Sequence, residues 1–162
     1  MKTSFNRQTN LDIEQMIEAI AENNLPKVEK LLQRGINLKE TTAFGSYALI
    51  EAAYGGRKEI AQLLITHGAD LNAQNKQGYT PLIWATIMRH YSTVELLLKN
   101  GAQTAIADNN RKTALHHAAT DADIIGLLNR AAAEQAQKQI EQLSQAVTKR
   151  PIAYKPPLKF IK

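Results

Sequence analysis

The residues best suited to bind a metal ion are two adjacent histidines, His116 and His117, followed by Asp121. Imidazole and carboxylate groups are common ligands of zinc. However, neighbouring side chains on a helix point about 100° apart, so the two histidines cannot easily grip one ion together. We therefore expect structural roles for these histidines, with no metal site and no cofactor.

Other arrangements that support catalysis are missing from the sequence. It contains no glycine-rich phosphate loop, no paired-carboxylate signature and no nucleophile elbow. It also contains no cysteine, which excludes a disulfide scaffold, a thiolate metal site and a cysteine nucleophile. These observations favour a protein that is not an enzyme, and the lack of cysteine suits a reducing compartment.

The chain is organised by a repeat of 33 residues, which must position every other feature. Residues of the same or a similar type recur at this interval in three series: Ala19, Ala52, Ala85 and Ala118; Met16, Leu49, Leu82 and Leu115; and Gly35, Gly68 and Gly101. Such a period predicts a stack of small units, each of which buries its apolar face against a neighbour. We expect all members of the first two series to lie in the core.

The third unit can be divided into elements from its residues. Gly78 predicts a turn, and Thr80 and Pro81 predict the start of a helix, because the hydroxyl caps free N–H groups and proline suits the first turn. A second apolar helix then ends at Asn100 and Gly101, a pair typical of a left-handed helix C-terminus. The unit therefore consists of turn, helix, turn and helix.

This unit resembles an ankyrin repeat through its segments 78–82 (GYTPL) and 95–102 (ELLLKNGA). The resemblance covers about residues 9–130, in repeats at about 9–41, 42–74, 75–107 and 108–130, of which the first and last are atypical. It implies an all-α solenoid of stacked helix-turn-helix units with β-turn tips. The fourth unit departs from the pattern, with Arg111 at the turn glycine, Ala114 at the proline and about two residues missing between its helices.

Residues 131–148 predict a helical extension of the fourth unit, because they are rich in strong helix formers. An apolar stripe runs along the extension, at Ala132, Ala136, Ile140, Leu143 and Val147. We favour a cap, in which this stripe folds against the last repeat. The alternative is a protruding helix that pairs with itself or with a partner, so we expect a monomer and keep a dimer as the alternative.

Residues 149–162 form a basic, proline-rich tail that predicts an extended chain. Its five positive charges equal the net charge of +5. The tail is disordered, lies along the repeats, or binds another protein, nucleic acid or an anionic membrane. The residues that would carry such binding are Lys149, Arg150, Tyr154, Lys155, Lys159 and Phe160.

The resemblance implies that a partner protein binds the concave face, at the turn tips and late in the first helix of each unit. By position, the predicted partner-binding residues are Phe44, Ser46, Tyr54, Lys76, Gln77, Tyr79, Ile87, Met88, Asn109, Asn110 and Lys112. The large apolar members would form a strip across two units. The resemblance also assigns Trp84 to the core, where room for partial exposure remains because indole is larger than the leucine of the pattern. It assigns His116 to a hydrogen bond with the backbone of a neighbouring loop.

We therefore predict a protein–protein interaction module. Small free-standing proteins that resemble this one often restrain or protect against one cognate enzyme or toxin. The alternative is a tethering protein whose basic tail binds nucleic acid or an anionic membrane. The N-terminus lacks the apolar core of a signal peptide, and no apolar run approaches the roughly 18 residues needed to cross a bilayer, so we expect a cytoplasmic location.

Overall fold

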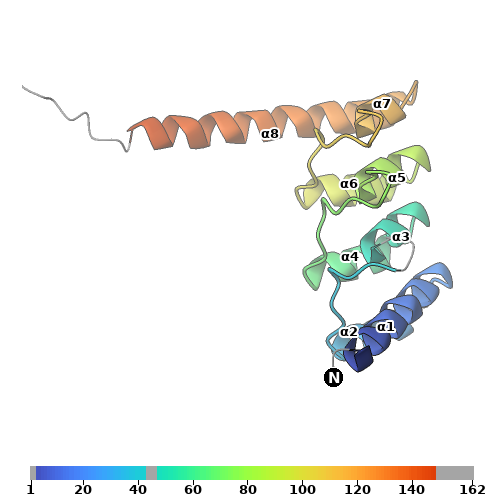
Figure 1. Cartoon of the computed structure of the whole chain (residues 1–162). Helices are drawn as coiled ribbons and strands as arrows, with labels where there is room; N and C mark the ends of the chain where they lie inside the picture. The colour runs from blue at the N-terminus through green and yellow to red at the C-terminus, as the bar shows by residue number, and fades with distance from the viewer. Residues whose placement is uncertain (1–2, 43–46, 149–162) are drawn as a thin grey trace, which may run out of the picture.

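A computed structural model describes residues 3–42 and 47–148 of the chain. Within this part the chain forms helices and no strand. The helices are α1 (Thr3–Ala21), α2 (Leu25–Gln33), α3 (Ala48–Tyr54), α4 (Lys58–Thr66), α5 (Pro81–Ile87), α6 (Tyr91–Lys99), α7 (Ala114–His117) and α8 (Ala122–Thr148). They form successive pairs that stack in one direction (Figure 1), which confirms the predicted all-α repeat fold.

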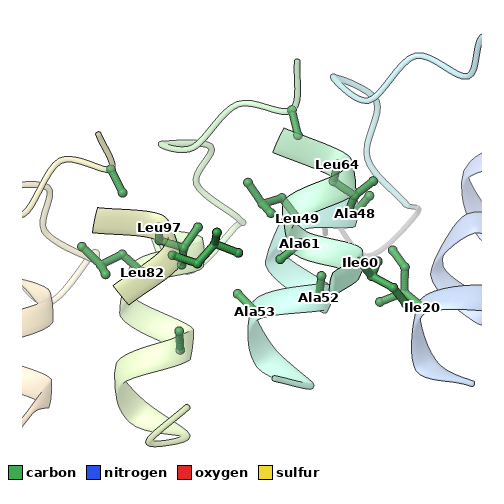
Figure 2. Packing of buried hydrophobic residues seen from close by; sticks show 14 of the residues in the cluster. Ile20, Ala48, Leu49, Ala52, Ala53, Ile60, Ala61, Leu64, Leu82 and Leu97 are labelled. Carbon is green, nitrogen blue, oxygen red and sulfur yellow. The ribbon is translucent and has the colours of Figure 1, made fainter. Parts of the chain in front are cut away.

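The stack has two layers. Helices α1, α3, α5 and α7 follow one another in the first layer, and α2, α4, α6 and the start of α8 follow one another in the second. Between the layers, apolar side chains from every unit join in one cluster, in which Figure 2 shows Leu49, Leu64 and Leu97. All four members of the alanine series are buried, because small side chains let neighbouring helices approach closely.

The ends of the helices follow the predicted signals. Thr80 Oγ1 accepts a hydrogen bond from the N–H of Ile83 at 3.2 Å, and Pro81 begins α5. Just beyond α2, α4 and α6, the chain turns at a glycine with positive φ, at Gly35, Gly68 and Gly101. Only glycine adopts this left-handed conformation without steric cost, so the repeated glycines set the length of these helices.

The core prediction is wrong for Leu115. Leu49 and Leu82 are each 1% exposed, whereas Leu115, which occupies the same place in the fourth unit, is 42% exposed. The next unit packs over Leu49 and Leu82, through α5 and α7 respectively. No further unit of the described chain packs over α7, so Leu115 has no cover.

The favoured cap is also wrong for the distal half of α8. Ile124, Leu128 and Ala131 are buried against the stack, but Ile140 and Leu143 are 60% and 61% exposed. Helix α8 continues straight past the edge of the stack (Figure 1), because nothing in its 27 residues turns it back. The protruding alternative therefore describes this part of the helix. None of the described helices is long and apolar enough to span a bilayer.

Candidate functional site

Four ring side chains form a continuous row across the second, third and fourth units. The ring of Trp84 meets that of Tyr54 edge-on, with centroids 5.1 Å apart, and that of Tyr79 at 4.9 Å. Tyr79 in turn meets His117 at 5.7 Å. We call Tyr54, Trp84, Tyr79 and His117 the aromatic row. Edge-to-face contacts of this kind are favourable, so each ring holds the next in position.

The first layer of helices positions the aromatic row. Tyr54 is the last residue of α3, Trp84 lies within α5, and His117 ends α7. The indole of Trp84 is half-buried between the two tyrosine rings, which agrees with the expected core role of a side chain too large to be covered completely. Trp84 and His117 stand 33 residues apart, and this shared register is the signal that could have placed both in the site.

The structure describes four of the five residues of the apolar strip predicted from the sequence. Tyr54 and Met88 are exposed, at 46% and 40%, while Ile87 and Tyr79 are half-buried. Ile87 occupies the place in α5 that Tyr54 occupies in α3, so the two lie in equivalent positions of adjacent units. Phe44 and Ser46 lie outside the described residues, as do the tail residues 149–162.

The turn tips of the third and fourth units are built alike. Asn75 Oδ1 accepts hydrogen bonds from the N–H groups of Gln77 and Tyr79, at 3.1 and 2.9 Å. Asp108 Oδ1 accepts the same pair of bonds from Asn110 and Lys112, at 2.8 and 3.0 Å. Such side-chain to backbone bonds mimic a turn, so one short polar residue fixes each tip.

Hydrogen bonds also join one tip to the next. Asn109 Nδ2 donates to the carbonyl of Lys76 at 2.9 Å, and the N–H of Asn109 donates to the carbonyl of Gln77 at 3.1 Å. The amide of Asn109, predicted to bind a partner, therefore holds two units together. The side chains of Lys76, Gln77, Asn110 and Lys112 are exposed along the same edge.

A buried carboxylate links the aromatic row to the tip of the fourth unit. Asp108 Oδ2 lies 2.8 Å from His117 Nε2, and the Asp108 side chain has no exposed surface. Burial alone would raise the pKa of Asp108, but hydrogen bonds from the Lys112 N–H, His117 and the Asn110 N–H outweigh it and lower that pKa. Asp108 was not among the predicted site residues, although it occupies the place of Asn75 one repeat later.

The histidines have different partners. His116 Nδ1 accepts a hydrogen bond from the backbone N–H of Thr113 at 3.2 Å, where the loop before α7 ends, which agrees with the expected bond to loop backbone and caps the helix. His90 Nε2 instead lies 2.9 Å from the carbonyl oxygen of Tyr54 in the preceding unit. Within the described part of the chain, no group of three or more His, Cys, Asp or Glu residues could hold a metal ion.

A second carboxylate stabilises the loop before α8. The hydroxyl of Tyr91 donates to Asp121 Oδ2 at 2.7 Å, and the N–H of Ile124 donates to Asp121 Oδ1 at 3.2 Å. These two bonds, the first above all, lower the pKa of Asp121. Asp121 therefore caps α8 and ties it to α6.

Comparison with known proteins agrees with this architecture. Residues 16–108 match the family model described as "Ankyrin repeats (3 copies)". A putative ankyrin repeat-containing protein of Treponema pallidum (strain Nichols) is 31% identical over 91 residues, which are 56% of this chain and 30% of that protein. The transient receptor potential cation channel subfamily A member 1 of Homo sapiens is 45% identical over 58 residues, which are 36% of this chain and 5% of the channel.

A plant relative aligns over a longer stretch. The probable E3 ubiquitin-protein ligase XBOS33 of Oryza sativa subsp. japonica is 32% identical over 111 residues, which are 67% of this chain and 21% of the ligase. The chain thus spans less than a third of the length of each of these relatives. Because the family match covers more than half of the chain, the protein belongs to the ankyrin-repeat family, whose stacked units are protein–protein interaction modules.

Proposed function

We propose that this protein is a non-enzymatic binder that captures one partner protein through the aromatic row and the adjacent turn tips, and blocks the activity of that partner. The observation that carries the proposal is the exposure of Tyr54 and Met88 beside the half-buried Trp84 and Tyr79. Large apolar side chains at a solvent-facing surface are typical of contact sites. Tyrosine and tryptophan are also enriched among the residues that dominate binding energy.

The rigidity of the row supports tight binding. Trp84 is held by two rings, and the carbonyl of Tyr54 is tied to His90 in the next unit. Side chains that are already ordered lose little conformational entropy when a partner binds. The exposed Lys76 and Lys112 at the tips favour a partner with acidic groups at the rim of the contact, although exposed charges add little affinity.

Affinity capture followed by calorimetry tests the proposal. The partner captured by the intact chain is identified and purified, and its dissociation constant is measured with Tyr54→Ala, Met88→Ala and the control Lys138→Ala, which lies on the protruding part of α8. We expect Tyr54→Ala to weaken binding by at least about 30-fold, equivalent to roughly 2 kcal/mol, and the control to have no effect. Unchanged affinity in both variants of the row would refute the assigned surface.

A separate measurement tests the inhibitory role. If the captured partner is an enzyme or a toxin, its activity is assayed with increasing amounts of this protein. We expect loss of activity at a one-to-one ratio, because a rigid stack placed over an active site excludes substrate sterically. Full activity in the saturated complex would leave binding intact but contradict inhibition.

The tail supports a rival function, that of a tether to nucleic acid or an anionic membrane. That function predicts binding that weakens steeply with salt and disappears when residues 149–162 are removed. Under our proposal, removal of the tail leaves capture of the partner protein unchanged. Tyr54→Ala and the chain without residues 149–162, measured side by side, therefore separate the two functions in one experiment.

A further inference from the structure

The end of the stack formed by the fourth unit carries an uncovered apolar face. Leu115 is exposed there, whereas its equivalent Leu82 is buried under the fourth unit. Ile125 behaves in the same way. It is the fourth residue of α8 and is half-buried, whereas the fourth residues of α4 and α6, Ala61 and Val94, are fully buried.

This face continues along α8 beyond the stack. From Ile125 it runs through Ala132, Ala136, Ile140 and Leu143, and we call these residues together with Leu115 the end face. The charged residues of α8 are Asp123, Arg130, Glu134, Lys138 and Glu141. Each stands two positions before a member of the end face, and two helical positions are about 200° apart. The side of α8 that carries the end face is therefore free of charge.

The described chain supplies no cover for the end face. Helices α2, α4 and α6 each have nine residues and are followed by a glycine with positive φ, where the chain turns back to begin the next unit. Helix α8 lacks that ending and has 27 residues. It therefore carries the chain away from the place that a fifth unit would occupy (Figure 1).

The pattern on α8 is complementary to itself. Ile125 and Leu143 stand nine positions on either side of Glu134, and Ala132 and Ala136 stand two positions on either side. When two copies of α8 lie antiparallel about a two-fold axis that passes at the level of Glu134, Ile125 of one copy meets Leu143 of the other. The alanines then lie at the crossing point, where small side chains let the helices approach closely.

We propose that the end face is the interface of a two-fold symmetric dimer of this protein, in which the α8 helices pair antiparallel. The protruding half of each α8 covers Ile125 and Leu115 of the other copy. No residue of the aromatic row belongs to the end face, so each copy keeps its own partner-binding surface. The inference is therefore independent of the proposed function.

Sedimentation equilibrium of the full chain tests the dimer. We expect a mass of twice 18.0 kDa for the wild type. The double variant Ile140→Glu/Leu143→Glu should sediment as a monomer, with an unchanged circular dichroism spectrum because both residues lie outside the stack. The matched control Lys138→Ala/Glu141→Ala, on the charged side of α8, should remain a dimer. A monomeric wild type at about 200 µM, or a dimeric double variant, overturns the proposal.

Cross-linking tests the geometry, since the chain contains no cysteine. A mixture of Ile125→Cys and Leu143→Cys should form a mixed disulfide on oxidation, whereas Leu143→Cys alone should not cross-link to itself. Self-cross-linking of Leu143→Cys indicates parallel helices and overturns the antiparallel arrangement. A chain that ends at Thr148 should also be dimeric. If only this shortened chain dimerises, residues 149–162 cover the end face instead, and the proposal fails.

Discussion

His117 Nε2 lies 2.8 Å from Asp108 Oδ2, and this contact joins the end of α7 to the turn tip that precedes it. The same carboxylate accepts two backbone N–H groups through its other oxygen. Asp108 therefore fixes both the tip of the fourth unit and the last ring of the aromatic row. Because these hydrogen bonds lower the pKa of Asp108 in spite of its burial, the ionised carboxylate contributes to the stability of this end of the stack.

We expect the stability of the protein to fall in acid partly through Asp108. Its pKa in the folded chain is below the ordinary value of 3.8, so the unfolded chain takes up this proton first as the pH falls. The contribution is complete at neutral pH, begins to be lost at about pH 5, and disappears once the pH passes below the folded pKa. Urea unfolding of the wild type and Asp108→Asn between pH 3 and 7 measures this contribution to the free energy of unfolding.

In that series Asp108→Asn should be less stable than the wild type at pH 7. The difference should shrink as the pH falls, since the Asp108 carboxylate of the wild type takes up a proton and loses its contribution, whereas the amide of the variant does not titrate. A difference that stays constant from pH 7 to 3 would show that Asp108 is equally protonated in the folded and unfolded chains, contrary to our account.

Gly56 is predicted to tolerate no side chain. Its φ is +64°, and a Cβ added there would lie 2.7 Å from Nδ1 of His90. Gly56→Ala should therefore strain the backbone and displace His90 from the carbonyl of Tyr54. The left-handed conformation alone costs about 1–2 kcal/mol, which we expect as a minimum loss in the free energy of unfolding. Chemical denaturation measures that loss.

Gly126 supplies the matched control. It lies inside α8, its φ is ordinary, and a Cβ added there meets nothing within 4 Å. Gly126→Ala should stabilise the protein by about 0.5–1 kcal/mol, because alanine restricts the unfolded chain and favours the helix. If both alanine variants shift stability in the same direction, local geometry is not the cause.

Arg111 is predicted to be a poor residue for its turn. It adopts φ +62°, where the third unit has Gly78 at φ +82°. Arg111→Gly should relieve backbone strain worth about 1–2 kcal/mol. Glycine also has greater freedom in the unfolded chain, which costs about 0.5–1 kcal/mol. The net gain in the free energy of unfolding is therefore roughly 0.5–1 kcal/mol. Thermal unfolding measures the gain. Asn110→Gly, at a neighbouring position without positive φ, should bring no gain in stability.

The repeat register predicted the features that depend on residues within one unit. The glycine after α6 and the threonine and proline that begin α5 are local signals, and the structure places each as expected. The register alone could not predict the exposure of Leu115, because Leu115 and Leu82 hold the same position in the repeat. Within the described chain, α7 packs over Leu82 and no further unit packs over Leu115, which is a property of the whole stack.

The direction of α8 and the partners of the aromatic row were also beyond the sequence. A stripe such as Ile140 and Leu143 is equally compatible with a helix that folds back and one that protrudes. The outcome depends on the rigid continuation of α8 from the fourth unit. Similarly, the row depends on which rings meet edge-on within and between units, and the size of Trp84 alone does not identify its neighbours.

In the contact between Tyr91 and Asp121, each group shifts the pKa of the other. The hydrogen bond to Asp121 raises the pKa of the Tyr91 hydroxyl, and the same bond lowers the pKa of Asp121. Tyr91→Phe should therefore raise the pKa of Asp121 toward 3.8, as followed by the carboxyl carbon shift in an NMR titration. The stability that Asp121 contributes above this pH should decrease accordingly. Tyr54→Phe, which removes a hydroxyl from a different unit, should leave the titration of Asp121 unchanged. An unshifted Asp121 in Tyr91→Phe would mean that the N–H of Ile124 and the charge of Arg89, rather than Tyr91, hold its pKa low.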